Sequence, residues 1–257
     1  MRTSPRLLVA SVALLGLLGA ACGSDDSDDA ATTTGDVTVF AAASLTAAFT
    51  EIGDAFMVAN PDSKVTFNFA ASSELVTQIG EGAPADVFAS ADKSNMAKLT
   101  DAGNNATEPE VFATNLLEIM VGAGNPKGIT GVADLADENL IVVICSPEVP
   151  CGKYAAQVFE SAAVTVTPKS LEQNVKPVVS KVTLGEADAG IVYKTDVTAA
   201  GDKAAGVDIP ADINVVAEYP IAVIKESANA VGAQAFIDFV NGEQGQKILA
   251  SYGFLAP

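Results

Sequence analysis

Residues 37–46 constrain the fold of this chain more than any other stretch, because they place a strand directly before a helix. Four β-favouring residues run from Val37 to Phe40, three alanines follow, and Ser44 then opens an apolar pattern. The apolar positions recur at the spacing of one helix face, at Leu45, Ala48, Phe49, Ile52 and Phe56. We therefore expect Ser44 to be the N-cap residue, with its hydroxyl and the following N–H groups facing outward. An anion can bind at such a helix start, and an ordinary capped helix would show the same pattern.

Strand-like and helix-like segments alternate along the rest of the chain. Ser72 repeats the arrangement of Ser44, since it follows a strand and two alanines and precedes a short helix. Apolar alternation and β-rich runs predict strands at 65–69, 84–89, 116–121, 140–144, 188–193, 213–217 and 220–224. Helical spacing and cap residues predict helices at 74–79, 92–101, 132–136, 154–163, 175–184, 229–240 and 244–251. Repeated strand–helix units predict an α/β fold whose mostly parallel sheets are covered by helices, with ligands at the C-terminal strand ends.

The amino terminus carries the features of an export signal. Two arginines precede an apolar run at 7–18 that is too short for a stable membrane span. The run ends in small residues directly before Cys22, which resembles a bacterial lipoprotein signal whose cysteine is lipidated. We therefore predict a signal peptide at 1–21 and a flexible acidic tether at 22–35. A plain secretory signal that is cleaved nearby is the alternative.

The charge balance excludes several classes of function. The only arginines, Arg2 and Arg6, lie in the predicted signal peptide, so a chain that begins at Cys22 has 12 lysines against 32 acidic residues. Its net charge is then 12 − 32 = −20, which disfavours nucleic-acid binding and repels anions at long range. Without histidine or arginine, such a chain has no histidine general base, no histidine metal ligand and no guanidinium clamp.

Several strand-to-helix junctions carry small or neutral residues instead of cationic ones. They are Ser44, Ser72, Cys151-Gly152 and Asn174-Val175, and Tyr193 ends a further strand. Helix N-termini that converge on one point can hold a dianion through neutral donors alone. Each hydrogen bond to a charged group contributes roughly 1.5–3 kcal/mol.

Four short motifs occur in a fixed order along the chain, at Val39–Thr46, Gly82–Asp92, Gly190–Tyr193 and Tyr252–Phe254. In sequence and spacing they resemble the molybdate-binding proteins of ABC importers, and the resemblance covers nearly all of 36–257. It implies a type II periplasmic-binding-protein fold, in which two α/β lobes are joined by two crossover strands and close on a tetrahedral oxyanion. Under this resemblance lobe I comprises 36–115 with 220–257, and lobe II comprises 116–219.

In that family the oxyanion is held by two serine hydroxyls, a tyrosine hydroxyl and backbone N–H groups. The resemblance assigns these contacts to Ser44, Ser72, Cys151, Val175 and Tyr193. Ser73 is the second choice for the second serine. Cys151 replaces an alanine that is common in the family, and a main-chain contact tolerates that change. On the residues alone, Ser72 could be a simple cap and Tyr193 a core tyrosine.

Cys145 and Cys151 lie six positions apart around two prolines. In an exported protein, the oxidising compartment and the short loop favour a disulfide between them. A redox or nucleophilic pair would need a histidine partner or Cys-x-x-Cys spacing, and the sequence has neither. A reduced, metal-binding pair is the third alternative.

The resemblance implies an exported solute-binding component that carries molybdate or tungstate to an ABC permease and its ATPase, with no cofactor and no enzymatic activity. The expected protein is a monomer that binds no nucleic acid. Lipid on Cys22 holds it at the outer face of the cytoplasmic membrane, either at the cell surface or in the periplasm. Three alternatives stay open: a binding protein for another tetrahedral oxyanion such as sulfate, an acidic hydrolase that uses Glu186 and Asp188, and a surface protein of the same fold that transports nothing.

Overall fold

The computed structural model describes residues 34–257, and these belong to one unit of the chain. The predicted signal peptide at 1–21, Cys22 and the predicted tether as far as residue 33 lie outside the described residues. Within the described part of the chain, no helix is both long enough and apolar enough to cross a membrane.

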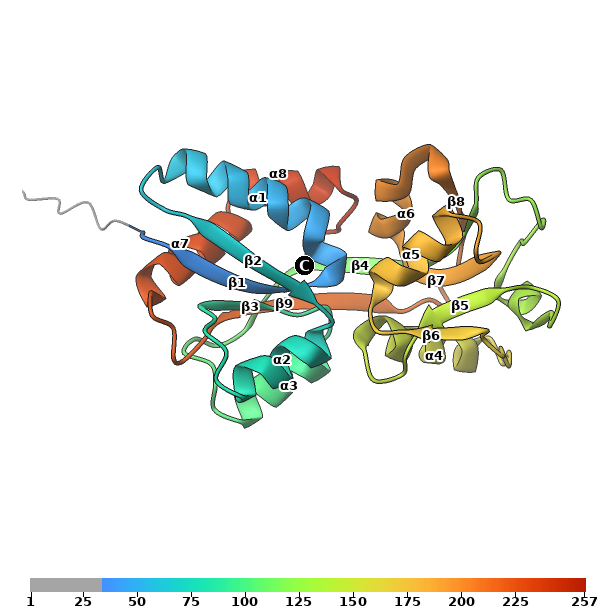
Figure 1. Ribbon diagram of the computed structural model, residues 1–257, viewed down its shortest axis with the longest axis horizontal. Helices are drawn as coiled ribbons and strands as arrows, with labels where there is room; N and C mark the ends of the chain where they lie inside the picture. Colours follow the sequence, from blue (N-terminus) through green and yellow to red (C-terminus); the bar gives the residue numbers. More distant parts are fainter. Residues whose placement is uncertain (1–33) are drawn as a thin grey trace, which may run out of the picture. The chain divides into compact units, whose positions relative to one another are not determined.

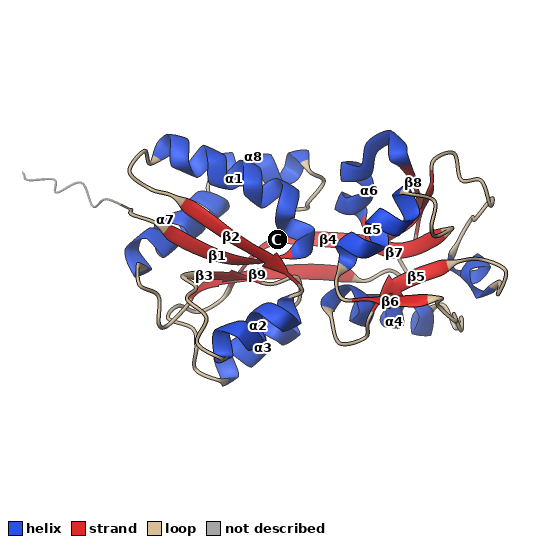
Figure 2. Cartoon of the chain, in the orientation of Figure 1, coloured by secondary structure: helices blue, strands red, loops and turns tan. Residues whose placement is uncertain are grey.

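Nine strands of the described chain form one mixed sheet (Figures 1 and 2). In spatial order they are β2 (Val65–Ala70), β1 (Val37–Ala42), β3 (Val87–Ala89), β9 (Val216–Val223), β4 (Glu110–Gly122), β7 (Ala189–Tyr193), β5 (Val142–Cys145) and β6 (Ser170–Glu172), with β8 (Ala204–Asp208) paired to β4. β1 runs parallel to β2 and β3, and β5 runs parallel to β6 and β7. The predicted parallel strands therefore occupy both ends of this order, whereas the long strands in its middle, β4 and β9, pair antiparallel.

The strands β4 and β9 connect the two ends of the sheet. β4 pairs with β9 along Glu110–Leu116, and its remaining residues pair with β7 and β8. We call β2, β1 and β3 with their helices the first half, and β7, β5, β6 and β8 with theirs the second half. The predicted lobe limits, at 115/116 and 219/220, fall inside β4 and β9. The division of the chain into lobes at those residues stays a prediction.

Helices cover both faces of the sheet (Figure 1). In chain order they are η1 (Ala43–Leu45), α1 (Thr46–Ala59), α2 (Ser72–Gly80), α3 (Lys93–Asp101), η2 (Val132–Ala136), α4 (Pro150–Ser161), α5 (Val175–Thr183), α6 (Lys194–Ala200), η3 (Gly201–Lys203), α7 (Ala230–Asn241) and α8 (Glu243–Ser251), where η marks a 3₁₀ helix. α1, α7 and α8 lie on one face of the first half, and α2 and α3 lie on the other.

The strand β1 is buried on both faces, and its sequence explains why. Val39 and Ala41 belong to an apolar cluster that also contains Phe49 of α1. Phe40 belongs to a second cluster, with Leu75 of α2. Because successive side chains of a strand point to opposite faces, a continuous apolar run fits a strand that is covered by helices on both sides. The first motif of the chain therefore begins in the middle of the core.

The strand β9 differs from its prediction. The sequence predicts separate strands at 213–217 and 220–224, but β9 runs without a break through Pro220. The register of the facing strand β4 shifts between Val111 and Ala113, directly opposite this proline. Proline lacks the N–H group that a regular ladder uses, and such an irregularity accommodates it. The short elements β6, β8 and α6 are not indicated by the sequence pattern either.

Candidate functional site

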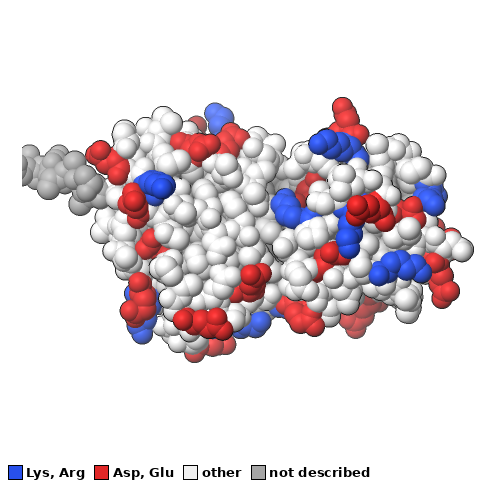
Figure 3. Space-filling model, in the orientation of Figure 1, with Lys and Arg blue, Asp and Glu red and all other residues white. Residues whose placement is uncertain are grey.

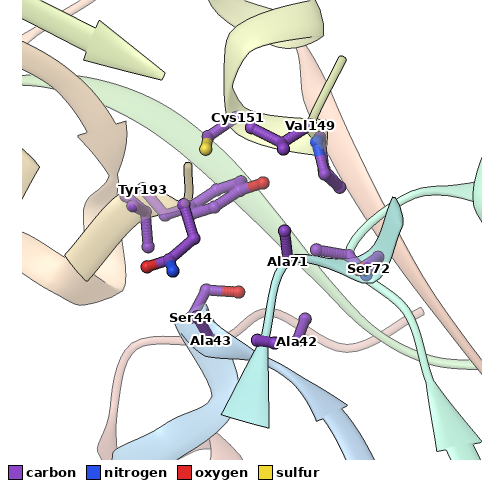
Figure 4. Close-up of a pocket in the computed structure, with 13 residues that line it drawn as sticks. Ala42, Ala43, Ser44, Ala71, Ser72, Val149, Cys151 and Tyr193 are labelled. Carbon is purple, nitrogen blue, oxygen red and sulfur yellow. The ribbon is translucent and has the colours of Figure 1, made fainter. Parts of the chain in front are cut away.

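A small cavity lies where the C-terminal ends of β1, β2 and β7 meet the first turns of α2, α4 and α5 (Figure 4). Its lining residues are all uncharged: Ala42, Ala43, Ser44, Ala70, Ala71, Ser72, Ala91, Val149, Pro150, Cys151, Asn174, Val175 and Tyr193. All five predicted contact residues are among them. Ser73, the second choice, lines a separate neighbouring hollow. The fold thus brings residues from positions 44 to 193 to one point.

The cavity has room for one small ion. Its volume is about 20 Å³, far below the roughly 300 Å³ at which pockets for drug-sized ligands begin. Among the described residues, no group of three or more His, Cys, Asp or Glu side chains is placed to hold a metal ion. The lining therefore offers neutral hydrogen-bonding groups to its ligand.

Tyr193 is the last residue of β7, and its phenol points into the cavity (Figure 4). The side chain is 1% exposed, and its hydroxyl has no hydrogen-bond partner among residues 34–257. A buried hydroxyl without a partner costs about 1–3 kcal/mol, so this group is prepared for a ligand atom. Burial raises the pKa of Tyr193 well above its usual value, and the neighbouring Tyr219 and Tyr154 raise this pKa further. The phenol is therefore neutral at physiological pH and can donate a hydrogen bond to an anion.

Ser44 is not the N-cap residue that the sequence predicts. It lies in the middle of η1, and α1 begins only at Thr46, with Leu45 as its N-cap residue. Neither helix start is capped by a side-chain hydrogen bond. The Oγ atom of Ser44 lies 3.1 Å from the hydroxyl of Tyr219 instead. The apolar spacing locates the helix correctly, but it does not show that a 3₁₀ turn precedes it.

Ser72 is the first residue of α2 and is fully buried. Its hydroxyl oxygen accepts a hydrogen bond from the backbone N–H of Ala91, at 3.0 Å. The hydroxyl does not cap its own helix, whose N-cap residue is Ala71. Because the oxygen accepts from Ala91, the hydroxyl proton is left to be donated, and Ser72 lines the cavity.

Two further helices, α4 and α5, begin at the cavity. Cys151 is the second residue of α4, after Pro150, and Val175 is the first residue of α5. Within residues 34–257, neither of these backbone N–H groups has a hydrogen-bond partner. Unpaired N–H groups in a first turn carry the positive end of the helix dipole and favour an anion. Asn174, the N-cap residue of α5, accepts a hydrogen bond from the next N–H group, that of Lys176, at 3.0 Å.

The loop before α4 is held in two ways. A disulfide joins Cys145, at the end of β5, to Cys151, which is the pairing that the sequence favours. The backbone of Gly152 also packs so closely on this loop that a Cβ atom there would lie 1.9 Å from the carbonyl oxygen of Ser146. Both features fix the position of the Cys151 N–H group relative to the cavity.

Replacing Gly152 by alanine is expected to lower the free energy of unfolding by about 1–3 kcal/mol, because the added methyl group forces the loop away from α4. Gly80→Ala is the matched control, since a Cβ atom at Gly80 meets nothing within 4 Å. Chemical denaturation of the two variants measures the difference. Equal stability of the two would show that the loop is not closely packed in solution.

The lysines that follow the lining residues in sequence are paired with carboxylates. Three ion pairs hold them, at N–O distances of 3.2, 2.9 and 2.9 Å, namely Lys153–Asp92, Lys176–Asp196 and Lys194–Asp208. On the face that Figure 3 shows, lysines are scattered among acidic side chains. An anion in the cavity would therefore meet oriented hydrogen-bond donors and helix dipoles, and these three lysines are already paired.

The two acids considered for a hydrolase lie away from the cavity. Glu186 is exposed. Asp188 accepts a hydrogen bond from the N–H of Ile141 at 2.8 Å and forms an ion pair with Lys127 at 3.5 Å. These contacts give Asp188 a structural role beside β7, and neither acid is among the residues that line the cavity.

One residue at the site is missed by the sequence patterns, namely Tyr219 of β9. Its ring is fully buried, and its hydroxyl contacts Ser44 from outside the cavity lining. Tyr219 falls between the strands predicted at 213–217 and 220–224, so the pattern places it in a turn. A buried tyrosine needs a partner for its hydroxyl, and that requirement is the signal that could have found it.

Comparison with known proteins identifies a family and a relative that agree with each other. A family model described as bacterial extracellular solute-binding protein matches residues 37–255. The molybdate-binding protein ModA of Mycobacterium tuberculosis is 42% identical over 252 residues, which cover 97% of this chain and 97% of that protein.

Solved structures show the same fold. A periplasmic molybdate-binding protein from Azotobacter vinelandii has a TM-score of 0.75 at 21% identity, covering 86% of this chain and 99% of that one. The sulfate-binding protein SubI from Mycobacterium tuberculosis has a TM-score of 0.78 at 22% identity, covering 86% of each chain. These likenesses confirm the predicted fold class. Because both a molybdate binder and a sulfate binder share it, the fold alone does not identify the ion.

Proposed function

This chain belongs to the bacterial extracellular solute-binding proteins, and on that premise we propose that it binds molybdate or tungstate for an ABC importer. The observation that carries the proposal is the unpartnered hydroxyl of Tyr193, which points into a small cavity lined by uncharged residues. A fully deprotonated tetrahedral oxyanion needs several donors around it, and this lining supplies them. The 42% identity to a molybdate-binding protein favours molybdate within that class of ions.

Five hydrogen-bond donors surround the proposed ion. Three are the hydroxyls of Ser44, Ser72 and Tyr193, and two are backbone N–H groups, at Cys151 and Val175. Each bond from such a donor to a charged oxygen contributes about 1.5–3 kcal/mol. The first turns of α4 and α5 add the positive ends of their dipoles. Together these groups replace the hydration shell of the dianion without any cationic side chain.

The donors come from both halves of the sheet, so the bound ion links the halves. Ser44 and Ser72 belong to the first half, whereas Cys151, Val175 and Tyr193 belong to the second. A ligand that binds donors from both halves stabilises the closed arrangement, in which the two halves enclose the ligand. We therefore propose that the ion leaves only when the two halves separate.

Direct contacts between the halves lie beside the cavity. The hydroxyl of Tyr154, in α4, donates to the carbonyl oxygen of Ala91 at 3.2 Å. The ammonium group of Lys153 pairs with Asp92 and donates to the hydroxyl of Ser94 at 2.7 Å. These contacts support a closed arrangement in which the ion is enclosed.

Isothermal titration of the purified protein with molybdate, tungstate, sulfate and phosphate tests the proposal. We expect one molybdate or tungstate ion per chain, bound more tightly than sulfate or phosphate. Phosphate carries a proton at neutral pH, and a site of converging donors leaves that proton without an acceptor. Sulfate is the second candidate because a sulfate-binding protein shares the fold. Tighter binding of sulfate would favour this candidate, and binding of none of the four ions would overturn the proposal.

The affinity for molybdate is expected to stay constant between pH 7 and about pH 9.5, where an ordinary tyrosine begins to ionise. Burial is the largest of the causes that raise the pKa of Tyr193 above its usual value. The phenol therefore keeps its proton and its role as a donor throughout this range. Donor strength is lost only as the pH rises through that raised pKa. Titrations with molybdate at half-unit steps of pH measure this affinity. An affinity that falls with a midpoint below pH 9 would contradict the assigned role of Tyr193.

We propose further that the protein works outside the cytoplasm as a monomer, beside an ABC permease and its ATPase. The extracellular family supports the location. The small residues before Cys22 support lipid on this cysteine as the anchor to the outer face of the membrane. Mass spectrometry of protein from the native host should find a lipidated N-terminal cysteine. An unmodified N-terminus at or beyond Cys22 would refute the anchor.

A further inference from the structure

Tyr219 lies next to the cavity, and its hydroxyl hydrogen-bonds the lining residue Ser44. The tyrosine belongs to β9, its side chain is fully buried, and its hydroxyl is 3.1 Å from the Oγ atom of Ser44. It is not one of the lining residues. This hydroxyl is therefore not a direct ligand of a bound ion, and Ser44 is the lining residue that it hydrogen-bonds.

Either hydroxyl can donate in the contact between Tyr219 and Ser44 when no ion is bound. A fully deprotonated oxyanion only accepts hydrogen bonds, so Ser44 must direct its single proton to a bound ion. The Ser44 oxygen then accepts, and the proton of the Tyr219 hydroxyl is directed to it across the 3.1 Å contact.

We infer that Tyr219 is a positioning residue that makes Ser44 a donor toward the bound oxyanion. When the Oγ atom of Ser44 accepts from Tyr219, the hydroxyl proton of Ser44 is left for the ion in the cavity. Without this partner, Ser44 can turn its oxygen lone pairs toward the ion, and these lone pairs repel an anion. The inference deepens the proposed function and rests on it, since Ser44 is one of the five donors.

The ring of Tyr219 is held by aromatic neighbours, which allows a clean test. Its centroid lies 5.4 Å from that of Phe254, 5.9 Å from that of Tyr193 and 6.3 Å from that of Phe112, all edge to face. Phenylalanine at position 219 keeps these contacts and removes only the hydroxyl. The variant Tyr219→Phe therefore isolates the hydrogen bond to Ser44.

Isothermal titration with molybdate is expected to show an affinity about 3- to 10-fold weaker for Tyr219→Phe than for the wild type, the range of one neutral hydrogen bond. Tyr252→Phe is the matched control, because the Tyr252 hydroxyl contacts Glu51 at the surface, and its affinity should be unchanged. In a Ser44→Ala background, adding Tyr219→Phe should change the affinity less than about 2-fold, since the two residues act as one unit. A purely structural role of Tyr219 predicts additive losses.

A crystal structure of unliganded Tyr219→Phe gives a readout that does not depend on the ion. The Ser44 hydroxyl should leave the position that it has in the wild type, because its partner is gone. Additive losses in the titrations, or an unchanged Ser44 side chain in the crystal, would overturn the inference. If the wild type binds none of the four ions, the proposed function fails, and the Ser44 position in the two crystals still decides the positioning role.

Discussion

Replacing Tyr193 by phenylalanine is expected to weaken molybdate binding by about 10- to 150-fold and to leave the unliganded protein at least as stable as the wild type. The affinity falls because the ion loses a donor in a buried site. Stability does not fall, because the Tyr193 hydroxyl has no partner among the described residues, and removing an unsatisfied group can add up to about 1 kcal/mol to the free energy of unfolding. The two effects therefore have opposite signs.

Titration calorimetry and chemical denaturation without ligand measure the two effects separately. Tyr154→Phe is the contrasting variant, since its hydroxyl already donates to the carbonyl oxygen of Ala91, and its removal should cost stability. A Tyr193→Phe variant that binds molybdate as well as the wild type would show that this hydroxyl does not reach the ion.

Ser72→Ala is expected to reduce both affinity and stability. The ion loses a donor, so its binding weakens by about 10- to 150-fold. The backbone N–H of Ala91 loses the oxygen that it binds at 3.0 Å, and Ala91 is buried. An unsatisfied buried N–H group lowers the free energy of unfolding by about 1–3 kcal/mol. Ser72→Ala and Tyr193→Phe should thus weaken binding by similar factors, whereas only Ser72→Ala should reduce stability.

Ser73→Ala is the control, because Ser73 is adjacent in sequence and lines the neighbouring hollow. It should leave both quantities close to those of the wild type. If Ser73→Ala weakened molybdate binding more than Ser72→Ala, the second choice for this contact would be the right one. The same calorimetric and denaturation measurements decide between the two serines.

Elements with local signals were predictable from the sequence. The sequence predicts that Asp92 begins a helix, and α3 starts one residue later, with the Asp92 side chain accepting the N–H of Asn95 at 2.8 Å. The apolar run predicts a strand that ends in Tyr193, and β7 ends at that residue. In each case, the residues that determine the element lie within a few positions of one another, so a local sequence pattern is enough to predict the element.

Features that depend on distant segments were not predictable in the same way. Ser44 fits the pattern of an N-cap residue, but its hydroxyl is used by Tyr219, which is 175 positions away. Pro220 is a break in the local pattern, and only the irregular register of β4 lets β9 continue through it. The backbone donors at Cys151 and Val175 have no side-chain signal, because any residue supplies an N–H group. The residue pattern marks only the strand-to-helix junctions that contain them, and their assignment as contacts rests on the family resemblance.

The convergence of groups from both halves of the sheet has a consequence for the order of events during folding. Ser44 and Tyr193 are the two donors farthest apart along the chain, and the long strands β4 and β9 connect the halves of the sheet that carry them. Such non-local pairings form late in chains of this topology. An ion that binds only the finished site slows unfolding and leaves the rate of folding unchanged. The chain is therefore expected to reach its native state without help from the ion, and the bound ion then lengthens the lifetime of that state.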